Sequence, residues 1–286
     1  MHYIETGPTD GETVLLIHGI PTHSYLWRDV IPELDGKHVI AFDLIGFGRS
    51  ERPDDLPYTP AMQVEFMQAF VEALALDDIH LVVHDLGGPV GLRWASEYPQ
   101  RLRSISMFET LWTTLPGIDS VPPPFGELLA AMRLPDVGED LVGRQNVFLA
   151  GLDGFTTGGV ASEDKEVYEF PWDDPEDRIR VFLPSGPRAF PVPEDPVAFD
   201  FVNAYEQFLA QSPLPKLVLD ADPGTLSMIE ILGPQGTDLR IADYAAEVFP
   251  NTTLADITDA GHFVQEDAPA SLGQALNTFI DDAALR

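Results

Sequence analysis

The 286-residue sequence contains no cysteine and only three lysines, Lys37, Lys165 and Lys216. The lack of cysteine excludes disulfides, thiolate metal sites and cysteine nucleophiles. The sequence also lacks an apolar run of the roughly 20 residues that a membrane-spanning helix needs. Its N-terminus has no basic stretch followed by an apolar one, the pattern of a secretory signal. We therefore expect a cytoplasmic protein with no membrane partner.

Basic residues are scarce, because 16 lysines and arginines stand against 47 aspartates and glutamates, for a formal net charge of −31. A surface of this sign repels nucleic acid and anionic lipid, which bind basic faces. It also disfavours an anionic substrate. Adaptation to high salt would explain the acidity, since salt screens like charges from one another. The alternative is a soluble protein that is simply acidic. We expect a monomer or small homo-oligomer with no nucleic-acid partner.

Short apolar runs that end at glycine or aspartate alternate along the chain with segments of helical spacing. Strands are expected at residues 13–17, 37–42, 79–83, 103–108, 214–219 and 251–257, and helices at 59–76, 89–98 and 272–280. This alternation predicts an α/β fold with a mostly parallel central sheet and helices on both faces.

Residues 112–211 interrupt this alternation. The segment is rich in proline at 121–125 and 184–196, and it shows helical pieces at 127–132 and 195–211 but no clear strand. We expect a helical cap domain over 112–211, inserted into a core domain formed by 1–111 and 212–286. Ligands bind at the carboxyl ends of parallel strands, so such a cap would cover the site.

Asp85 lies in the stretch Val83-His-Asp-Leu-Gly-Gly88, after an expected strand and before an expected helix. A sharp turn in this position is typical of the nucleophile elbow, where serine is the usual occupant. A carboxylate at a helix N-terminus stays ionised and can attack carbon. The alternative is an aspartate that only caps the helix.

A histidine late in the chain, His262, follows the last expected strand. It fits the base of a triad in the order nucleophile, acid, histidine. The alternative is a solvated loop histidine. The acid is expected after a strand end, which is met by Glu109 after 103–108 and by Asp220 or Asp222 after 214–219. Periodicity does not choose between them.

The pair His18-Gly19 follows the first expected strand. In this order before an elbow, the backbone N–H groups of Ile20 and Leu86 are placed to form an oxyanion hole.

Several of these stretches resemble the haloalkane dehalogenases of the α/β-hydrolase fold, from about residue 3 to 280. The matching stretches are His18-Gly-Ile-Pro-Thr-His-Ser-Tyr-Leu-Trp-Arg28, Asp43-Leu-Ile-Gly-Phe-Gly-Arg-Ser50, His84-Asp-Leu-Gly-Gly88, Phe108-Glu109, Gln145-Asn-Val-Phe148, Ser212-Pro-Leu-Pro-Lys216, Asp222-Pro-Gly224 and Gly261-His-Phe-Val-Gln-Glu-Asp267. His-Gly-x-Pro and the elbow aspartate also occur in epoxide hydrolases. The Tyr-Leu-Trp-Arg and His-Phe-x-Gln-Glu-Asp stretches are more specific.

The resemblance implies that Asp85 is the nucleophile, His262 the base and Glu109 the supporting acid, with Asp222 in reserve. It implies hydrolysis through an alkyl-enzyme ester, without a cofactor or metal. The implied substrate is a small, neutral, apolar haloalkane, and a halide ion leaves. Phe148, in the aromatic-rich cap, is expected to contact the substrate.

Two positions depart from the family pattern. The dehalogenases hold the leaving halide with a tryptophan after the nucleophile, where this chain has Leu86, and an asparagine after His-Gly, where it has Ile20. Each missing charge-assisted hydrogen bond is worth about 1.5–3 kcal/mol. The indole N–H of Trp112 is a candidate replacement, with Trp172 a weaker one; a packing role is the alternative for both.

Two other functions stay open. An epoxide hydrolase would use the same aspartate and histidine with cap tyrosines as proton donors, for which Tyr168 and Tyr205 are available. A binding protein without turnover is the other. A serine esterase is disfavoured, because no serine occupies the elbow.

Overall fold

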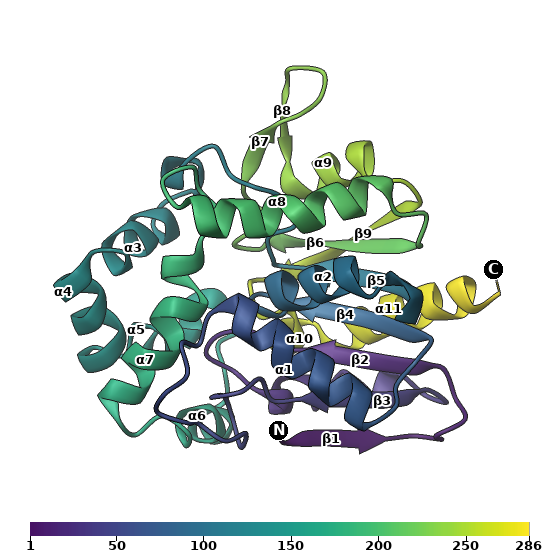
Figure 1. Cartoon of the computed structure of the whole chain (residues 1–286), viewed down its shortest axis with the longest axis horizontal. Helices are drawn as coiled ribbons and strands as arrows, with labels where there is room; N and C mark the ends of the chain where they lie inside the picture. The colour runs from purple at the N-terminus through teal and green to yellow at the C-terminus, as the bar shows by residue number, and fades with distance from the viewer. Residues whose placement is uncertain (286) are drawn as a thin grey trace.

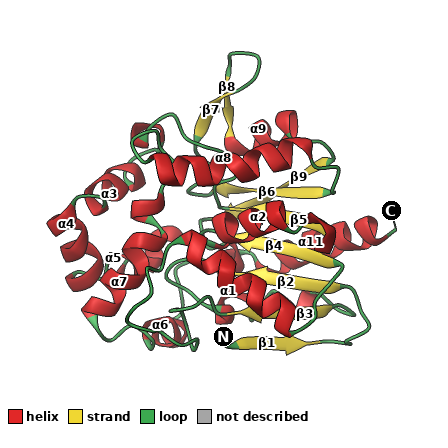
Figure 2. Ribbon diagram, viewed as in Figure 1, coloured by secondary structure: helices red, strands yellow, loops and turns green. Residues whose placement is uncertain are grey.

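The computed structural model describes residues 1–285 and contains a twisted seven-stranded sheet at its centre (Figures 1 and 2). The strand order is β1-β3-β2-β4-β5-β6-β9. Strand β1 runs antiparallel to β3, and every other neighbouring pair in this sheet is parallel. The strands are β1 (Tyr3–Thr6), β2 (Thr13–Ile17), β3 (His38–Phe42), β4 (Ile79–His84), β5 (Leu102–Phe108), β6 (Lys216–Pro223) and β9 (Thr252–Ala260). The mostly parallel sheet expected from the sequence is confirmed.

Helices cover both faces of the sheet. Helices α1 (Pro60–Ala73), α2 (Gly87–Glu97) and α8 (Pro196–Gln211) lie side by side in front of it, and α11 (Pro269–Ala284) lies behind (Figure 1). Helix α9 (Ile241–Val248) packs on β6 and β9. Strands β2, β3 and β4 are almost wholly buried between these layers, which explains why their sequences are mainly apolar.

Local sequence explains where these helices begin. Thr59 caps α1 by accepting a hydrogen bond from the Met62 N–H, and Pro60 takes the first helical position. Helix α2 has no such cap, and its start is shaped by close packing instead. A Cβ on Gly87 would lie 2.5 Å from the Ile17 carbonyl oxygen, and one on Gly88 would lie 1.7 Å from the Thr110 hydroxyl. Only glycine lets α2 approach the sheet this closely.

Outside the segment between β5 and β6, the sequence did not predict β1, α9, α10 (Val264–Asp267) or a hairpin of β7 (Glu230–Leu232) with β8 (Asp238–Arg240). Strand β1 is half exposed and lies at the sheet edge, so it has no continuous apolar run. The hairpin strands have three residues each, too few to show a period.

The segment between β5 and β6 contains helices joined by loops and no strand among its described residues, and most of it lies beyond the carboxyl ends of the strands (Figure 1). Its helices are α3 (Phe125–Met132), α4 (Pro135–Glu139), a π-helical turn (Asp140–Arg144), α5 (Val147–Ala150), α6 (Ser162–Glu169), α7 (Pro175–Ser185) and α8. Helix α8 packs on α2, so the range 112–211 includes one helix that covers the sheet rather than its end. None of the helices formed by residues 1–285 has the length and apolar content that crossing a bilayer requires.

Candidate active site

Four loops that follow strands β2, β4, β5 and β9 meet at one edge of the sheet. They carry Ile20, Asp85, Glu109 and His262. Both acids lie in sharp turns, since Asp85 has φ of 48° and Glu109 has φ of 42°. For non-glycine residues this left-handed backbone costs about 1–2 kcal/mol each. Main-chain bonds hold the two turns together, because the Asp85 N–H donates to the Glu109 carbonyl (3.1 Å) and the Thr110 hydroxyl donates to the Asp85 carbonyl (2.6 Å).

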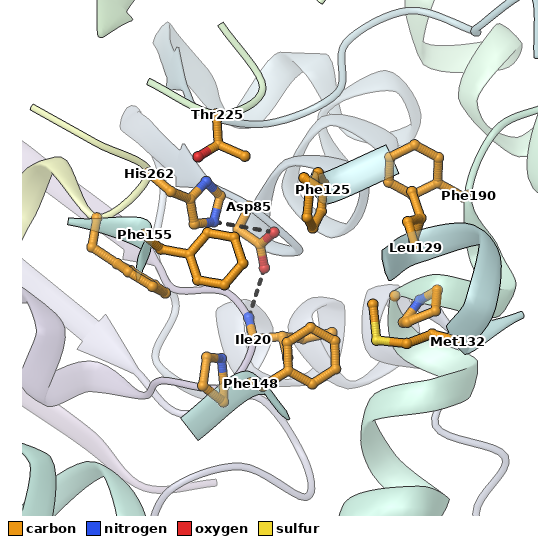
Figure 3. A pocket seen from close by; sticks show the side chains of 14 residues that line it. Ile20, Asp85, Phe125, Leu129, Met132, Phe148, Phe155, Phe190, Thr225 and His262 are labelled. Atoms are coloured by element: carbon orange, nitrogen blue, oxygen red, sulfur yellow. Dashed lines mark hydrogen bonds and ion pairs between the residues drawn. The ribbon is translucent and has the colours of Figure 1, made fainter. Parts of the chain in front are cut away.

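The imidazole of His262 lies between the two carboxylates. Its Nδ1 is 2.9 Å from Glu109 Oε2, and its Nε2 is 3.6 Å from Asp85 Oδ2. The other oxygen of Asp85 accepts a hydrogen bond of 2.7 Å from the Ile20 N–H (Figure 3). The structure therefore brings together the three side chains that the sequence singled out, and it places one of the two expected oxyanion donors on the Asp85 carboxylate.

Main-chain groups hold the carboxylate of Glu109. It accepts hydrogen bonds from the N–H groups of Thr225, Leu226 and Ser227, at 3.0, 2.9 and 3.0 Å. Burial raises the pKa of this carboxyl, but His262 and these donors outweigh burial and leave the pKa below its usual value. Glu109 is therefore ionised despite being buried.

Asp85 and His262 form a charged pair. Burial opposes the charge on Asp85, but the His262 and His84 rings and the Leu86 N–H together lower its pKa. Burial also opposes the charge on His262, yet hydrogen bonds and charge interactions with Asp85 and Glu109 raise its pKa to about 9. The imidazole is therefore protonated near neutral pH, with a carboxylate on each side.

A second buried histidine, His84, supports the site. One of its ring nitrogens, Nε2, lies 2.9 Å from the His262 carbonyl oxygen, which can only accept, so Nε2 carries the proton. Burial and the nearby His262 charge lower the pKa of His84 to about 3, so the ring is neutral. Sequence reasoning did not give His84 a role, although it directly precedes Asp85.

A small apolar cavity of about 70 Å³ opens beside Asp85 (Figure 3). The cap supplies much of its wall, through Phe125, Leu129 and Met132 from α3 and Phe148 from α5. Phe148, which the sequence analysis expects to contact the substrate, lines this cavity. Among the described residues that line this cavity, only Asp85, Thr225 and His262 have polar side chains.

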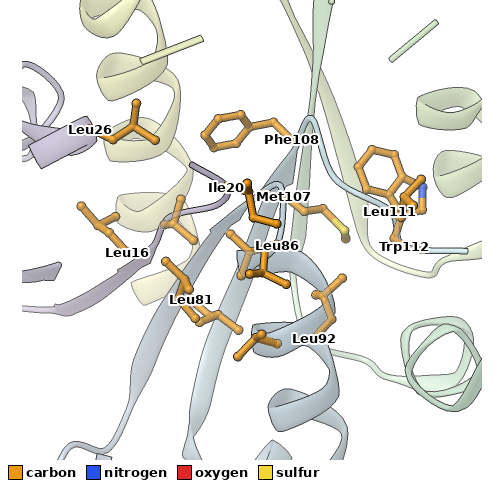
Figure 4. Close-up of a cluster of buried hydrophobic side chains, with 14 of the residues drawn as sticks. Leu16, Ile20, Leu26, Leu81, Leu86, Leu92, Met107, Phe108, Leu111 and Trp112 are labelled. Carbon is orange, nitrogen blue, oxygen red and sulfur yellow. The ribbon is translucent and has the colours of Figure 1, made fainter. Parts of the chain in front are cut away.

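A second cavity of about 60 Å³ lies on the other side of Asp85. It shares Ile20, Asp85, Gly186 and Phe190 with the first and is also lined by Leu86. Figure 4 shows the Ile20 and Leu86 side chains together, among apolar neighbours. At these two positions, where the family carries asparagine and tryptophan, the chain presents hydrocarbon.

The expectation that Trp112 donates to a leaving group is wrong. Its side chain is buried next to Leu111 (Figure 4). Its indole N–H donates to the Ile241 carbonyl, 3.0 Å away. The weaker candidate Trp172 donates to the Pro21 carbonyl at 3.2 Å. Neither indole lines the two cavities, because each buried N–H is satisfied by a main-chain oxygen instead.

The reserve acid is also corrected. Asp222 is exposed on β6, opposite Thr258 of β9, and the His262 ring contacts Glu109 instead. Asp220 forms an ion pair of 2.9 Å with Arg240. Neither acidic side chain of β6 therefore contacts His262.

The two cap tyrosines do not reach the first cavity. Tyr168 donates its hydroxyl to Glu266, and Tyr205 donates its hydroxyl to the Leu111 carbonyl at 2.7 Å. Both are buried, and neither lines the cavity beside Asp85. The proton donors that an epoxide hydrolase needs are therefore not supplied by these residues.

The sheet, the elbow after β4 and the late histidine define the α/β-hydrolase fold, whose family model matches residues 12–155. Among curated proteins, the chain is 34% identical to a haloalkane dehalogenase of Agrobacterium fabrum over 284 residues, which are 98% of this chain and 88% of that protein. It is 36% identical to one of Sphingobium indicum over 290 residues, 98% of this chain and 91% of that protein.

Among solved structures, a putative ancestral haloalkane dehalogenase superposes with a TM-score of 0.90 at 31% identity, covering 100% of this chain and 96% of that one. The chain therefore belongs to the haloalkane dehalogenase family.

Proposed function

We propose that the protein hydrolyses the carbon–halogen bond of small, uncharged haloalkanes, with release of an alcohol and a halide ion. The observation that carries this proposal is the ionised carboxylate of Asp85, which borders an apolar cavity and lies within 3.6 Å of the His262 ring. The names of the curated relatives support the same activity. A net charge of −31 is compatible with an uncharged substrate.

In the first step, a carboxylate oxygen of Asp85 attacks the carbon that bears the halogen. A carbon–oxygen ester bond forms as the carbon–halogen bond breaks, and the halogen leaves with the bonding electrons as halide. The small apolar cavity holds the carbon close to Asp85.

Ester formation also prepares the base for the second step. The negative charge of Asp85 is one of the causes that raise the pKa of His262 to about 9. Once Asp85 is an ester, only Glu109 remains, so the pKa of His262 falls and its proton is released to solvent. The resulting neutral imidazole is able to take a proton from water.

The activated water attacks the carbonyl carbon of the ester. The Ile20 N–H lies on one oxygen of this carboxyl group and, with the Leu86 N–H, stabilises the oxyanion. The alkyl oxygen leaves as the alcohol with the proton from His262, and Asp85 is regenerated. Overall, haloalkane and water give alcohol, halide and one proton.

Bromide release from 1-bromobutane and 1,2-dibromoethane tests the proposal, with styrene oxide as the comparison substrate. We expect bromide from the first two compounds and no diol from the third. Replacing His262 with phenylalanine should stop turnover and leave the alkyl group on Asp85, visible as added intact mass. Diol formation without bromide release, or bromide release without a trapped adduct, would contradict the proposed mechanism.

A further inference from the structure

We propose that the hydroxyl of Thr225 holds the water molecule that attacks the alkyl-enzyme ester, and this role rests on the proposed function above. It makes Thr225 a water-positioning residue of the second step. The carboxyl of Asp85, the imidazole of His262 and this hydroxyl are the polar side chains of the cavity. Of these, Asp85 becomes the ester that is attacked, so His262 and Thr225 remain to bind water.

A water molecule in a protein cavity needs two to four polar partners. Ring nitrogen Nε2 of His262 supplies one, because Nδ1 is occupied by Glu109 at 2.9 Å. The other described residues of the wall have apolar side chains or are proline and glycine. Without a second partner, a water bound at the imidazole would be free to rotate and to drift from the line of attack. The Thr225 hydroxyl is the side chain that is able to fix it.

The position of Thr225 is tied to the base through one shared oxygen. Its backbone N–H donates to Glu109 Oε2 at 3.0 Å, and the same oxygen faces His262 Nδ1. The loop carrying Thr225 therefore keeps its place relative to the imidazole. Figure 3 shows the threonine beside His262, with its hydroxyl on the side of the ring.

The hydroxyl is free to bind water. Within residues 1–285, the backbone N–H of Thr225 has a partner, whereas its Oγ1 takes part in no hydrogen bond. The side chain is half-buried and lines an otherwise apolar wall. A hydroxyl without a partner beside an apolar wall is unfavourable, because it loses hydrogen bonds that it would make in water. A water molecule between Oγ1 and the imidazole removes this cost and is then placed for attack.

Two substitutions separate hydrogen bonding from shape. Thr225→Val keeps the branched shape and removes the hydroxyl, whereas Thr225→Ser keeps the hydroxyl and removes a methyl group. The control is Thr278→Val, the same substitution at an exposed position of α11 outside the cavity, for which the bromide burst and the ester decay should match the parent. Rapid-quench reactions with 1-bromobutane report two quantities for each variant: the initial burst of bromide, which measures ester formation, and the ester mass, which measures its decay.

For Thr225→Val we expect an unchanged bromide burst and ester hydrolysis slowed by about 10-fold, the effect of one lost hydrogen bond. The ester should then be visible by intact mass in the steady state. Thr225→Ser should hydrolyse the ester at nearly the parent rate. A role in packing would give the opposite order, because valine preserves the shape and serine does not. Circular dichroism establishes that each variant is folded.

Other outcomes overturn the proposal. If Thr225→Val hydrolyses the ester as fast as the parent, the hydroxyl does not position the water. If Thr225→Val slows the bromide burst and leaves ester decay unchanged, the hydroxyl serves the leaving halide instead. If the parent protein itself forms neither bromide nor ester, the proposed function is wrong, and this assignment with it.

Discussion

At the scale of single residues, the charge of His262 depends on the state of its neighbours. Asp85 and Glu109 hold the imidazole between two carboxylates, which raises its pKa to about 9. The site therefore rests as an ion pair and acquires its base only when Asp85 has reacted. A carboxylate nucleophile makes this possible, because its alkylation removes a full negative charge.

The raised pKa of His262 makes stability depend on pH. The imidazole has a pKa of about 9 in the folded protein and 6.5 as its ordinary value. Its contribution to folding is complete below pH 6.5 and is lost as pH rises through 9. We expect the melting temperature of the parent, relative to His262→Phe, to fall over this interval. Both proteins retain Lys216, whose pKa of about 8 therefore cancels. A difference that is constant with pH would contradict the assignment.

The missing halide donors lead to a second expectation at this scale. Leu86→Trp and Ile20→Asn would each restore one N–H donor, worth about 1.5–3 kcal/mol or roughly 10- to 100-fold in rate. We expect faster bromide release from 1-bromobutane for each variant. The cavity lined by Leu86 offers space for a larger ring.

The control for these variants is Leu86→Phe, which fills the same space without an N–H. If phenylalanine accelerates the reaction as much as tryptophan, the gain comes from filling the cavity rather than from stabilising the halide.

The sequence was sufficient to find Asp85 and His262, because a tight turn after a strand and a late histidine have motif signatures. Strand and turn patterns were not sufficient to choose between Glu109 and Asp222, and only the family resemblance favoured Glu109. Both follow strands, and the choice depends on backbone N–H groups at 225–227 that no side-chain pattern shows. The direction of the Trp112 indole N–H was not predictable either, because it depends on how the chain turns after β5.

At the scale of elements, a buried charge cluster joins α6 of the cap to the core. Arg28 forms two hydrogen bonds with Glu266, at 2.7 and 2.8 Å, and a third with Asp164 of α6 at 3.0 Å. Tyr168 of α6 also donates to Glu266. Since Glu266 lies four residues after His262, this cluster connects the cap to the loop that carries the base.

Removing Arg28 should therefore weaken both the cap and the site. The side chain of Glu266 is only 6% exposed, so Arg28→Met leaves a buried charge without its partner, at a cost of about 3–5 kcal/mol. Urea unfolding measures this loss, and hydrogen exchange should show faster opening of α6. In the double variant with Glu266→Gln, part of the loss should be recovered.

The control is Arg144→Met, which breaks an ion pair whose arginine is 73% exposed. We expect no measurable change in stability there. Equal losses for Arg28→Met and Arg144→Met would mean that the Arg28 cluster does not hold the cap.

Elements with continuous apolar sequence were predictable, and short or exposed ones were not. Strand β2 has the bounds expected from the sequence, and β3, β4 and β5 differ by one residue at one end. The hairpin of β7 and β8 was not predicted, because strands of three residues are too short to show the alternation of apolar and polar residues. Register between strands depends on pairing across the sheet, which the sequence does not display.

At the scale of the whole molecule, the net charge of −31 is spread over a chain of 286 residues. Like charges at this density repel one another and oppose the compact state. Salt shortens the Debye length from about 10 Å at 0.1 M to about 3 Å at 1 M. We expect the melting temperature to rise over this range of sodium chloride. A melting temperature that is flat or falls with salt would show that self-repulsion is not limiting.

Salt should affect the activity much less than the melting temperature. An uncharged haloalkane is not steered by the protein's field, so KM for 1-bromobutane should stay constant over this salt range. A KM that changes strongly with salt would argue for a charged substrate.

Composition predicted the sign of the protein's net charge, and the alternation of strands and helices predicted the layers of the fold. In sequence, α8 is a helix like those before it, so its packing on α2 was not predictable.

The backbone hydrogen bonds that hold Glu109 have a consequence for how the nearby cavities could change during evolution. Three main-chain N–H groups fix the carboxylate, and every residue type other than proline provides such a group. The side chain at 226 is therefore not needed to hold the acid, because only the Leu226 N–H contacts it. Leu226 lines the second cavity, so its side chain can change by mutation or by design while Glu109 keeps its place, and the shape of that cavity can evolve independently of the acid.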